Sequence, residues 1–397
     1  MAVAARPEPS PRTSRRFSWD VIRVVAILLV MIGHFTGVAS DIPGIEPYPL
    51  RIDLRFGTIT LLVLSGYFIG PTLRRGAPGR WFRARLARLL PAYLAAVLLV
   101  YAVSRYAVVR FNGGAHQDGL SGLLFLDPVM PLEPAPDALP TWHVPDLNDL
   151  LLHVFLLHEW NPDGWHRIDG SYWTMPVQVA AFAVAALLWR GGVHRRVGMP
   201  AVLWSAMAVS AVARVVRDFA GVLPAATGML HAYLFAAGVA IWLWQQRRLS
   251  SAQLGALLAT ALVIQCFHGP WPAVLGFALV LGAMCAAARG PDWDVRGTRL
   301  LRRPVSWLAG ISYCLYLVHQ QLGYVIARGL SEAGVSPWWL RLAMVAGAAL
   351  VLGWLLTVGV ERPAYGRLVQ RDAPVVACST RPVGSRDARG TFVGGPP

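Results

Sequence analysis

Lysine is absent from this sequence of 397 residues, and charged residues of every kind are scarce. They make up 14% of the chain, against about 25% in a soluble globular domain, while hydrophobic residues make up 55%. A chain this poor in charge along its whole length has too few polar side chains to cover a water-exposed surface. The composition therefore excludes a soluble globular protein and predicts an integral membrane protein.

All 36 basic residues are arginines, and the chain carries a net charge of +15. In a soluble protein such a charge would indicate nucleic-acid binding. Most of these arginines stand between apolar runs, so the charge is assigned to the membrane surface and no nucleic-acid partner is expected. Because lysine is absent throughout, an arginine at any one position does not by itself indicate that a site there needs the planar guanidinium group.

Cysteine is also rare. The four cysteines are Cys266, Cys285, Cys314 and Cys378. The first three lie in apolar segments, and no two cysteines form a C-x-x-C pair. Buried thiols commonly act as small apolar side chains, so we expect free cysteines without a disulfide. No metal ion is expected in this protein.

Apolar runs of about 20 residues, the length needed to cross a bilayer, recur along the chain. The ten predicted spans are residues 20–40, 56–73, 89–109, 173–189, 199–217, 229–245, 252–268, 272–288, 305–327 and 338–360. The expected fold is an all-α integral membrane bundle of about ten transmembrane helices, crossing the lipid bilayer of the plasma membrane many times. A further apolar stretch, Leu147 to Leu157, is too short to span and is predicted to be re-entrant or interfacial.

Arginine content alternates between successive connecting segments. Three quarters of the arginines lie in six segments, residues 6–23, 74–88, 190–196, 247–248, 289–303 and 362–389. The segments between them hold fewer arginines and several acidic residues. Since arginine-rich loops stay in the cytoplasm, this alternation predicts that both termini are cytoplasmic.

Composition divides the chain into three parts. Residues 1–16 and 372–397 are rich in Pro, Gly, Ser and Arg, and are expected to be a disordered cytoplasmic arm and tail. Residues 17–371 are expected to form one transmembrane domain. Within it, residues 110–172 contain many Pro and Trp residues, which predicts an ordered outer cap. Three ionisable residues interrupt the first apolar run, so a cleaved signal peptide is not expected.

Those three residues are Asp20, Arg23 and His34. Ionisable side chains inside a span are costly and usually line a polar cavity. At 100° per residue, Arg23 and His34 lie within about 20° on the helix and about 16 Å apart along it, and Asp20 lies within about 60° of both. Histidine suits general-base catalysis because its pKa is near the working pH. The alternative is a histidine that only packs between helices.

Two more groups of polar residues share helix faces. Arg85 and Arg88 are three residues apart, so they can grip phosphate groups together; the alternative is ordinary cytoplasmic anchoring. Ser312, Tyr316 and His319 fall within about 60° on one face. Such a polar stripe either lines a site or merely joins helices by hydrogen bonds.

These residues belong to a series of motifs that runs from residue 17 to residue 365. The motifs are Arg23-x10-His34, Leu64-Ser-Gly-Tyr-Phe-Ile69, Arg85-x-x-Arg88 before Pro91, His153 to His158 followed by Ile168-Asp-Gly-Ser-Tyr-Trp-Thr174, Ser312 to His319, and Glu361-Arg-Pro363. In this order they resemble the acyltransferase-3 family of membrane O-acyltransferases.

The resemblance implies an enzyme that uses a cytoplasmic acyl-CoA donor to acylate a hydroxyl of a carbohydrate or small molecule. It implies that His34 is the essential catalytic residue. Asp20, which shares the helix stripe of His34, is also predicted to be catalytic. It also implies that Arg23, Arg85 and Arg88 serve the donor. The other expected cavity residues are Ser65, Tyr67, Trp173, Gln178, Ser312, Tyr316 and His319.

The sequence departs from the family pattern at Gln178, where relatives usually have a glutamate. A neutral amide cannot act as a carboxylate, so Gln178 cannot supply the charge that a catalytic or ion-pairing glutamate would have at this position. Two alternatives stay open beside an acyltransferase that acts on a cell-envelope glycan. One is a transporter of a small polar metabolite, because ten spans with polar stripes also describe a permeation path. The other is the same chemistry on a secreted antibiotic.

Overall fold

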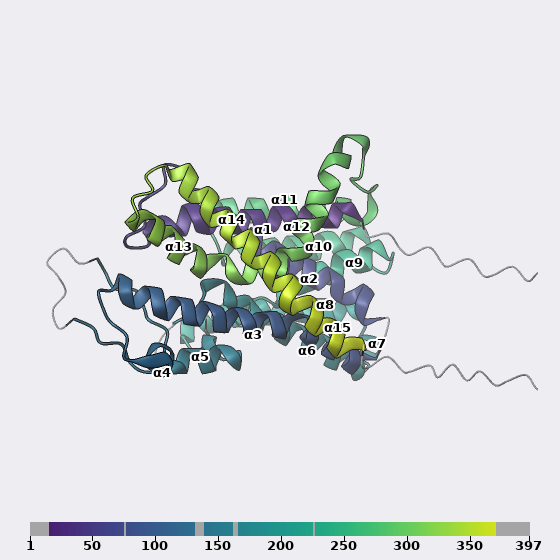
Figure 1. Cartoon of the computed structure of the whole chain (residues 1–397). Helices are drawn as coiled ribbons and strands as arrows, with labels where there is room; N and C mark the ends of the chain where they lie inside the picture. Colours follow the sequence, from purple (N-terminus) through teal and green to yellow (C-terminus); the bar gives the residue numbers. More distant parts are fainter. Residues whose placement is uncertain (1–15, 75–76, 132–138, 162–165, 225–226, 371–397) are drawn as a thin grey trace, which may run out of the picture.

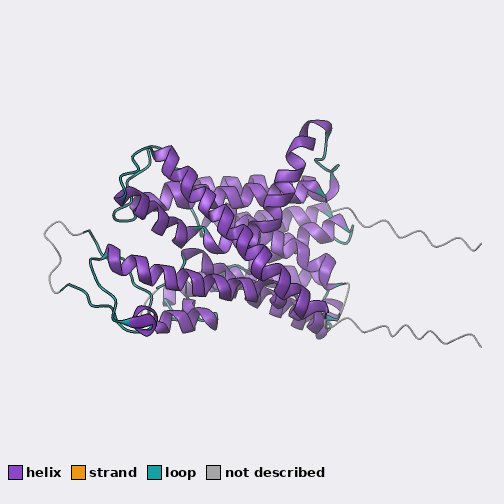
Figure 2. Ribbon diagram, viewed as in Figure 1, coloured by secondary structure: helices purple, strands orange, loops and turns teal. Residues whose placement is uncertain are grey.

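The computed structural model describes residues 16–74, 77–131, 139–161, 166–224 and 227–370. In these ranges the chain consists of helices and loops, and extended pairing is limited to an isolated bridge between Ala115 and Val129 (Figure 2). The predicted tail and all of the predicted arm except Arg16 lie outside the described residues, as does Cys378.

The helices lie roughly along one direction and form an elongated bundle (Figure 1). The α-helices are α1 Phe17–Ile32, α2 Gly57–Leu73, α3 Pro78–Phe111, α4 Gly119–Leu124, α5 Leu147–Val154, α6 Thr174–Arg190, α7 Val193–Arg196, α8 Met199–Ala220, α9 Ala232–Gln245, α10 Ser251–Cys266, α11 Trp271–Arg289, α12 Arg299–Val318, α13 Gln320–Glu332, α14 Trp338–Leu356 and α15 Arg362–Gln370. The π-helical turns are η1 Gly33–Gly37 and η6 Thr357–Glu361, and the 3-10 turns are η2 Val38–Asp41, η3 His158–Trp160, η4 Gly170–Trp173 and η5 Arg296–Thr298.

Six helical segments among the described residues are long and apolar enough to cross a membrane. They are Phe17–Asp41, Pro78–Phe111, Gly170–Arg190, Met199–Ala220, Trp271–Arg289 and Trp338–Val369. Each matches one of the ten predicted spans. Three more predicted spans correspond to α2, α9 and α10, which have 17, 14 and 16 residues. At 1.5 Å per residue these helices fall short of the roughly 30 Å hydrocarbon core, so their crossing stays a prediction.

The prediction of one continuous helix over residues 305–327 is wrong. The helix breaks at His319, where α12 ends and α13 begins. Neither glycine nor proline stands at the break, so the sequence carries no helix-breaking signal there. The cause is tertiary: a distant segment hydrogen-bonds backbone groups that a continuous helix would pair with each other.

Close packing of α2 against α9 brings two layers of the bundle together. A Cβ atom on Gly66 would lie 2.5 Å from the carbonyl oxygen of Phe235, and one on Gly238 would collide with the carbonyl of Val63. Small residues at such crossings let two membrane helices approach closely, and the backbone contact compensates for the lack of a hydrophobic driving force within lipid. The Leu64–Ile69 motif therefore places one face of α2 against α9 and leaves another face toward α1.

The outer cap predicted over residues 110–172 is held to α3 by Arg105, which is almost fully buried. Its guanidinium donates hydrogen bonds to the backbone carbonyls of Leu123, Leu126 and Pro145. A buried arginine is tolerated because these carbonyls satisfy its donors. Arg105 therefore ties the described part of the cap, which includes α4 and α5, to α3. The apolar stretch 147–157 forms α5, whose eight residues are too few to span.

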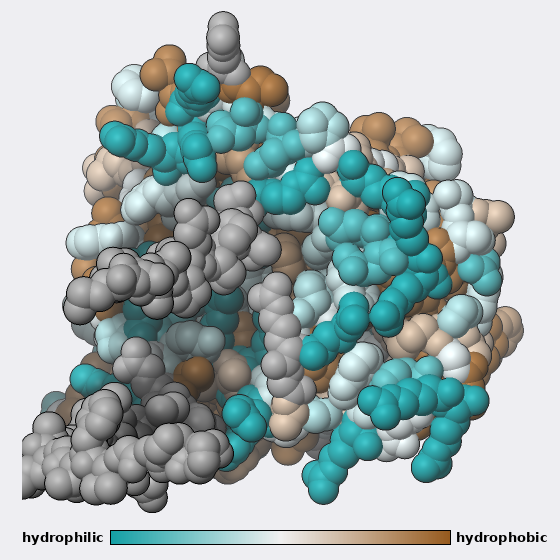
Figure 3. Space-filling model, turned by 90° about the vertical axis from the view of Figure 1, so that its right-hand side faces the viewer, coloured by the Kyte–Doolittle hydropathy of each residue, from teal (hydrophilic) through white to brown (hydrophobic). Residues whose placement is uncertain are grey.

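Hydrophilic side chains gather at one end of the bundle (Figure 3). This is the end from which both ends of the described chain emerge, and where α7 and α15 lie (Figure 1). Large apolar side chains are exposed along the flanks, among them Leu98, Val212 and Leu279. One expectation needs correction here: of the three described cysteines only Cys314 is buried, whereas Cys266 at the end of α10 is exposed.

Candidate active site

A cavity of about 430 Å³ lies between α1, α2, α3, α6 and α12. Eight of the predicted site residues line it: Asp20, Arg23, Ser65, Arg85, Arg88, Gln178, Ser312 and Tyr316. They come from motifs up to 296 positions apart in the chain, from the first span to the Ser312–His319 block. The fold therefore brings most of the predicted site together in one place.

One end of the cavity is rich in arginine. The arginine end is defined by Arg16, Arg23, Arg85 and Arg88, with the buried carboxylate of Asp20 beside them. Arg85 is held in place by α2, because its Nη2 atom donates to the Phe68 carbonyl at 3.1 Å and to Thr72 Oγ1 at 2.7 Å. The excess of positive charge makes this end suited to an anion with several phosphate oxygens.

Arg88 is paired with a residue from the far end of the sequence. Its Nε atom lies 3.6 Å from Glu361 Oε1, and the Glu361 side chain is only 9% exposed, against 52% for Arg88. Cys314 also donates a hydrogen bond to this carboxylate, at 3.3 Å. No role was predicted for the Glu361-Arg-Pro363 motif, and the structure shows that it supports the arginine end. The signal in the sequence for such a role was Glu361, an ionisable residue at the end of the last predicted span.

Gln178 lines the middle of the cavity, opposite α2. Ser65 Oγ lies 3.4 Å from Gln178 Oε1 and also donates to the Leu61 carbonyl at 3.0 Å. The position at which the sequence departs from the family pattern therefore faces the cavity. It is occupied by an uncharged hydrogen-bonding group.

The other end of the cavity is formed by Thr174 and Tyr316, and a pair of histidines lies behind Tyr316. The rings of Tyr316 and His319 are 5.6 Å apart between centroids. His319 Nε2 and His34 Nδ1 are 2.8 Å apart. The two imidazoles are tilted by only 9° with centroids 5.0 Å apart, which is the geometry of an in-line hydrogen bond between nearly coplanar rings. We call Thr174, Tyr316 and the two histidines the histidine end.

Donor and acceptor roles in the pair follow from a backbone carbonyl. His319 Nδ1 lies 2.8 Å from the Tyr316 carbonyl, which can only accept, so Nδ1 carries the hydrogen. In neutral His319 the Nε2 atom then has a lone pair and accepts a hydrogen bond from His34 Nδ1. This leaves Nε2 of His34 unprotonated. His34 itself lies in the π-helical turn that follows α1 and is partly exposed, and such turns are common at functional sites.

The histidine end depends on a short segment that precedes α6. Asp169 is fully buried, and its Oδ2 atom accepts from the backbone N–H of Gln321 at 2.8 Å. The Tyr172 hydroxyl donates to the carbonyl of Leu317 at 2.9 Å. In a continuous helix the Gln321 amide would pair with the Leu317 carbonyl. Asp169 and Tyr172 therefore stabilise the helix break, and the break is where His319 sits.

Asp169 and Tyr172 were not among the candidate site residues, although they belong to the quoted Ile168–Thr174 motif. Their role depends on contacts across 152 positions of sequence for Asp169 and 145 for Tyr172. Asp169 is itself fixed locally, because its Oδ1 atom accepts from the backbone N–H of Ser171 at 2.8 Å. The one signal in the sequence was an ionisable residue, Asp169, close to the start of a predicted span.

Four predicted site residues are absent from the lining of the cavity: His34 and His319 lie behind Tyr316, whereas Tyr67 and Trp173 face elsewhere. The Tyr67 hydroxyl donates to Gln245 Oε1 at 2.5 Å, and its ring packs against Trp19. Trp173 contacts the ring of His231, with centroids 4.8 Å apart. Both residues pack helices together and neither lines the cavity.

Asp20 and His34 are separated along the first helix. Fourteen residues at 1.5 Å each place them about 20 Å apart. Asp20 Oδ2 instead accepts a hydrogen bond from Ser306 in α12, at 3.0 Å. The two residues therefore serve different ends of the cavity.

Comparison with known proteins supplies the family. A family model described as an acyltransferase domain matches residues 16–358. No curated protein and no solved structure matches the chain. The matched range contains Arg23, His34, Arg85, Arg88 and His319, and it includes five of the six membrane-spanning candidates in full and most of the sixth. This membrane protein therefore belongs to the acyltransferase-3 family.

Proposed function

We propose that this acyltransferase moves an acyl group from acyl-CoA to a hydroxyl of a carbohydrate or of a sugar-bearing small molecule, with His34 as the general base. One observation carries the proposal. A single cavity has anion-binding side chains at its arginine end, and an oriented imidazole pair lies behind its other end. That arrangement suits a long donor whose phosphates and reactive thioester are far apart.

The arginine end would hold the phosphate groups of CoA. Arg85 and Arg88 line the cavity from α3 and Arg23 lines it from α1, so a bound polyphosphate would be surrounded from two sides. Asp20 is assigned to this end, where its charge balances the arginines rather than acting on the reacting atoms. The pantetheine arm would extend past Ser65 and Gln178 toward Tyr316.

The histidine end would perform the transfer. The acceptor O–H bond breaks as its proton moves to Nε2 of His34, and the oxygen forms a bond to the thioester carbonyl carbon. The C–S bond then breaks, and the departing thiolate of CoA takes the proton from His34. The enzyme returns to its starting form without a covalent intermediate. His319 is a positioning residue, because it fixes the His34 tautomer through the Nδ1 hydrogen bond.

Further assignments rest on the sequence and the family. We propose a multi-pass protein of the plasma membrane with cytoplasmic termini, so that the arginine end faces cytoplasmic acyl-CoA. The transferred group is assigned as acetyl or another short acyl chain. The acceptor is assigned as an envelope glycan, and a glycosylated antibiotic is the alternative.

The test uses the purified protein in detergent with acetyl-CoA labelled in its acetyl group. Oligosaccharides and a glycosylated small molecule are supplied in parallel as acceptors. We expect release of free CoA thiol that depends on the acceptor, together with a labelled ester. If calorimetry shows no CoA binding to the wild type, the donor assignment fails and transport of a small polar metabolite becomes the favoured function.

A further inference from the structure

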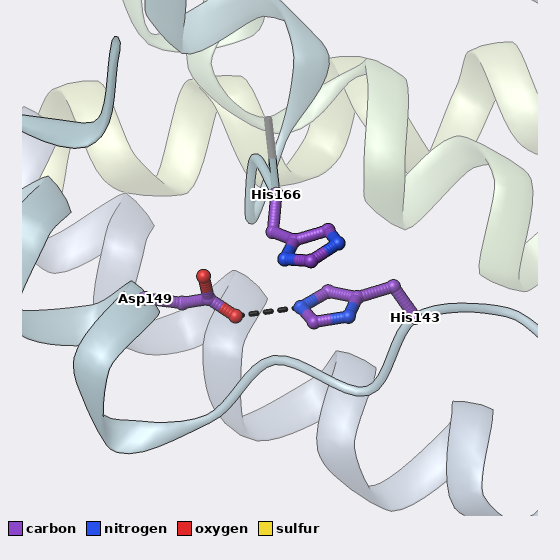
Figure 4. Close-up of side chains that lie close together, drawn as sticks. All are labelled: His143, Asp149 and His166. Carbon is purple, nitrogen blue, oxygen red and sulfur yellow. Dashed lines mark hydrogen bonds and ion pairs between the residues drawn. The ribbon is translucent and has the colours of Figure 1, made fainter. Parts of the chain in front are cut away.

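A second cluster of chemically active side chains lies in the cap, away from the cavity. His143 precedes α5, Asp149 lies in the first turn of α5, and His166 precedes η4. Their ligand atoms all lie within 4.8 Å of one another. Figure 4 shows the three side chains close together, with Asp149 hydrogen-bonded to His143 and the ring of His166 beside that of His143. Nothing in the proposed transfer reaction uses them.

Contacts within the cluster are already close. His143 Nε2 lies 2.6 Å from Asp149 Oδ2. The rings of His143 and His166 are stacked, with centroids 3.9 Å apart and a tilt of 10°. Two imidazoles held face to face beside one buried carboxylate form a group of three potential ligands.

We propose that His143, Asp149 and His166 bind a divalent transition-metal ion, with Zn²⁺ as the best match. Two imidazole nitrogens and one carboxylate oxygen are a common zinc ligand set, and three protein ligands leave a fourth position open to water. Carboxylate-only sites would instead favour Mg²⁺ or Ca²⁺. The proposal departs from the sequence-based expectation of no metal, because only the fold brings these three residues together.

The geometry allows the ion to enter with small movements. Ligand atoms around tetrahedral zinc lie about 3.3 Å apart, given bonds of about 2.0–2.1 Å. The ion would replace the hydrogen between His143 and Asp149, and neutral His143 would then carry its hydrogen on Nδ1. The stacked rings must turn so that both ring nitrogens point to the ion. Both imidazoles are exposed enough to rotate, while Asp149 is only 3% exposed and stays fixed.

Residues next to each ligand are already anchored, which lowers the cost of organising the site. Trp142 is pinned to the end of α3 by two hydrogen bonds with the Asn112 side chain, at 2.8 and 2.9 Å. The Asp146 backbone N–H donates to Asp149 Oδ2 at 3.1 Å and orients the carboxylate. Such outer hydrogen bonds to a ligand commonly tune metal affinity.

The third ligand is anchored from its other side. Arg167, which follows His166, makes two hydrogen bonds to the carboxylate of Glu159, at 2.6 and 2.8 Å. Three residues after His166 comes Asp169, which stabilises the break between α12 and α13. A bound ion would therefore fasten the start of the segment that holds the histidine end.

Metal binding is measured on purified protein that carries no polyhistidine tag and has been stripped with a chelator. Zn²⁺ is titrated by calorimetry, and Co²⁺ is used as a visible-absorption probe of the site. We expect one ion per chain, and a higher thermal unfolding temperature when Zn²⁺ is present. His143→Ala and His166→Ala should each weaken Zn²⁺ binding by at least about 100-fold, because loss of even an outer-shell partner costs 10–100-fold.

His116→Ala is the matched control, since His116 lies in the same cap but outside the cluster, against Tyr106. It should leave binding unchanged. The two histidine variants keep the test valid if a change at buried Asp149 prevents folding. The proposal is overturned if the wild type binds no ion. It is equally overturned if both histidine variants bind Zn²⁺ as tightly as His116→Ala does.

Discussion

The arginine end and the histidine end of the cavity hold their polar groups by different means. At the arginine end, charged side chains with partial exposure face the cavity, and Arg88 is 52% exposed while paired with Glu361. At the histidine end, His319 is fully buried, as is Asp169 in the segment that supports this end, and each is hydrogen-bonded to backbone groups. Exposed charges are screened by salt and rearrange easily, whereas buried hydrogen bonds are not screened and tolerate little change. The first end is therefore suited to binding and the second to chemistry.

The largest expected effect is at the histidine end. His34→Ala removes the proposed general base, so kcat should fall by about 10²–10⁴-fold while acyl-CoA still binds. The measurements are the rate of transfer of a labelled acetyl group and the Kd for CoA. Near-normal turnover by a folded variant would show that His34 does not act as the base.

His319 tests whether orientation of His34 matters separately. His319→Leu removes the acceptor for His34 Nδ1 and should lower kcat by about 100-fold. In His319→Gln the side-chain oxygen can reach the position of Nε2 and again accept that hydrogen bond, so part of the rate should return. Recovery of kcat in this second variant distinguishes a positioning role of His319 from a packing role. Equal losses in the two variants would mean that His319 only fills space.

The arginine end should respond through affinity rather than rate. Replacing Arg85 and Arg88 together with Gln removes two phosphate contacts and should raise the Kd for CoA by about 10–100-fold at low salt. Most of this difference should vanish at high salt, because exposed charges are screened over about 8–10 Å at ordinary ionic strength. Calorimetry at two salt concentrations measures both effects.

Arg80→Gln with Arg83→Gln is the control for that pair. It removes the same charge from the same helix at residues that do not line the cavity. If both double variants weaken CoA binding equally, the effect is general electrostatics. The phosphates would then rest on other arginines.

Asp169→Asn should act on stability first. The amide keeps the size of the side chain but turns a donor toward the backbone N–H of Gln321 or Ser171, which leaves one buried donor without an acceptor. Such a loss costs about 1–3 kcal/mol. Thermal unfolding in detergent measures the change. An unaltered unfolding temperature would mean that the helix break does not depend on Asp169.

The smallest effect is expected from Gln178→Glu. The added charge faces a cavity lined by four arginines, so it should be tolerated, with a change in kcat of less than about tenfold. A gain in activity would indicate that this chain has lost a function its relatives keep. Failure of the variant to insert would mean that the site is too apolar for a carboxylate.

Periodicity and motif order predicted the helical class of the fold and eight of the residues that line the cavity. Helix geometry is local, so spacing alone predicted that Arg85 and Arg88 share one face of α3 and that Ser312 and Tyr316 share one face of α12. The cavity lies against both faces. The contact between His34 and His319 was beyond such reasoning, since it joins residues 285 positions apart. The break at His319 was missed for the same reason, because it depends on Asp169 and Tyr172. Tyr67 and Trp173 were misplaced because spacing along a helix does not reveal which neighbour covers each face.

The helix break also bears on how the protein is made. Asp169 and Tyr172 leave the ribosome well before Leu317 and Gln321, the residues whose backbone they bind. Until α12 and α13 have been inserted, the carboxylate of Asp169 has no backbone partner from them, and His34 has no second imidazole. Contacts this distant in sequence form late in assembly. A partly synthesised chain therefore lacks the contact between His34 and His319, and a product truncated before residue 319 would lack one of the two histidines that the proposed transfer requires.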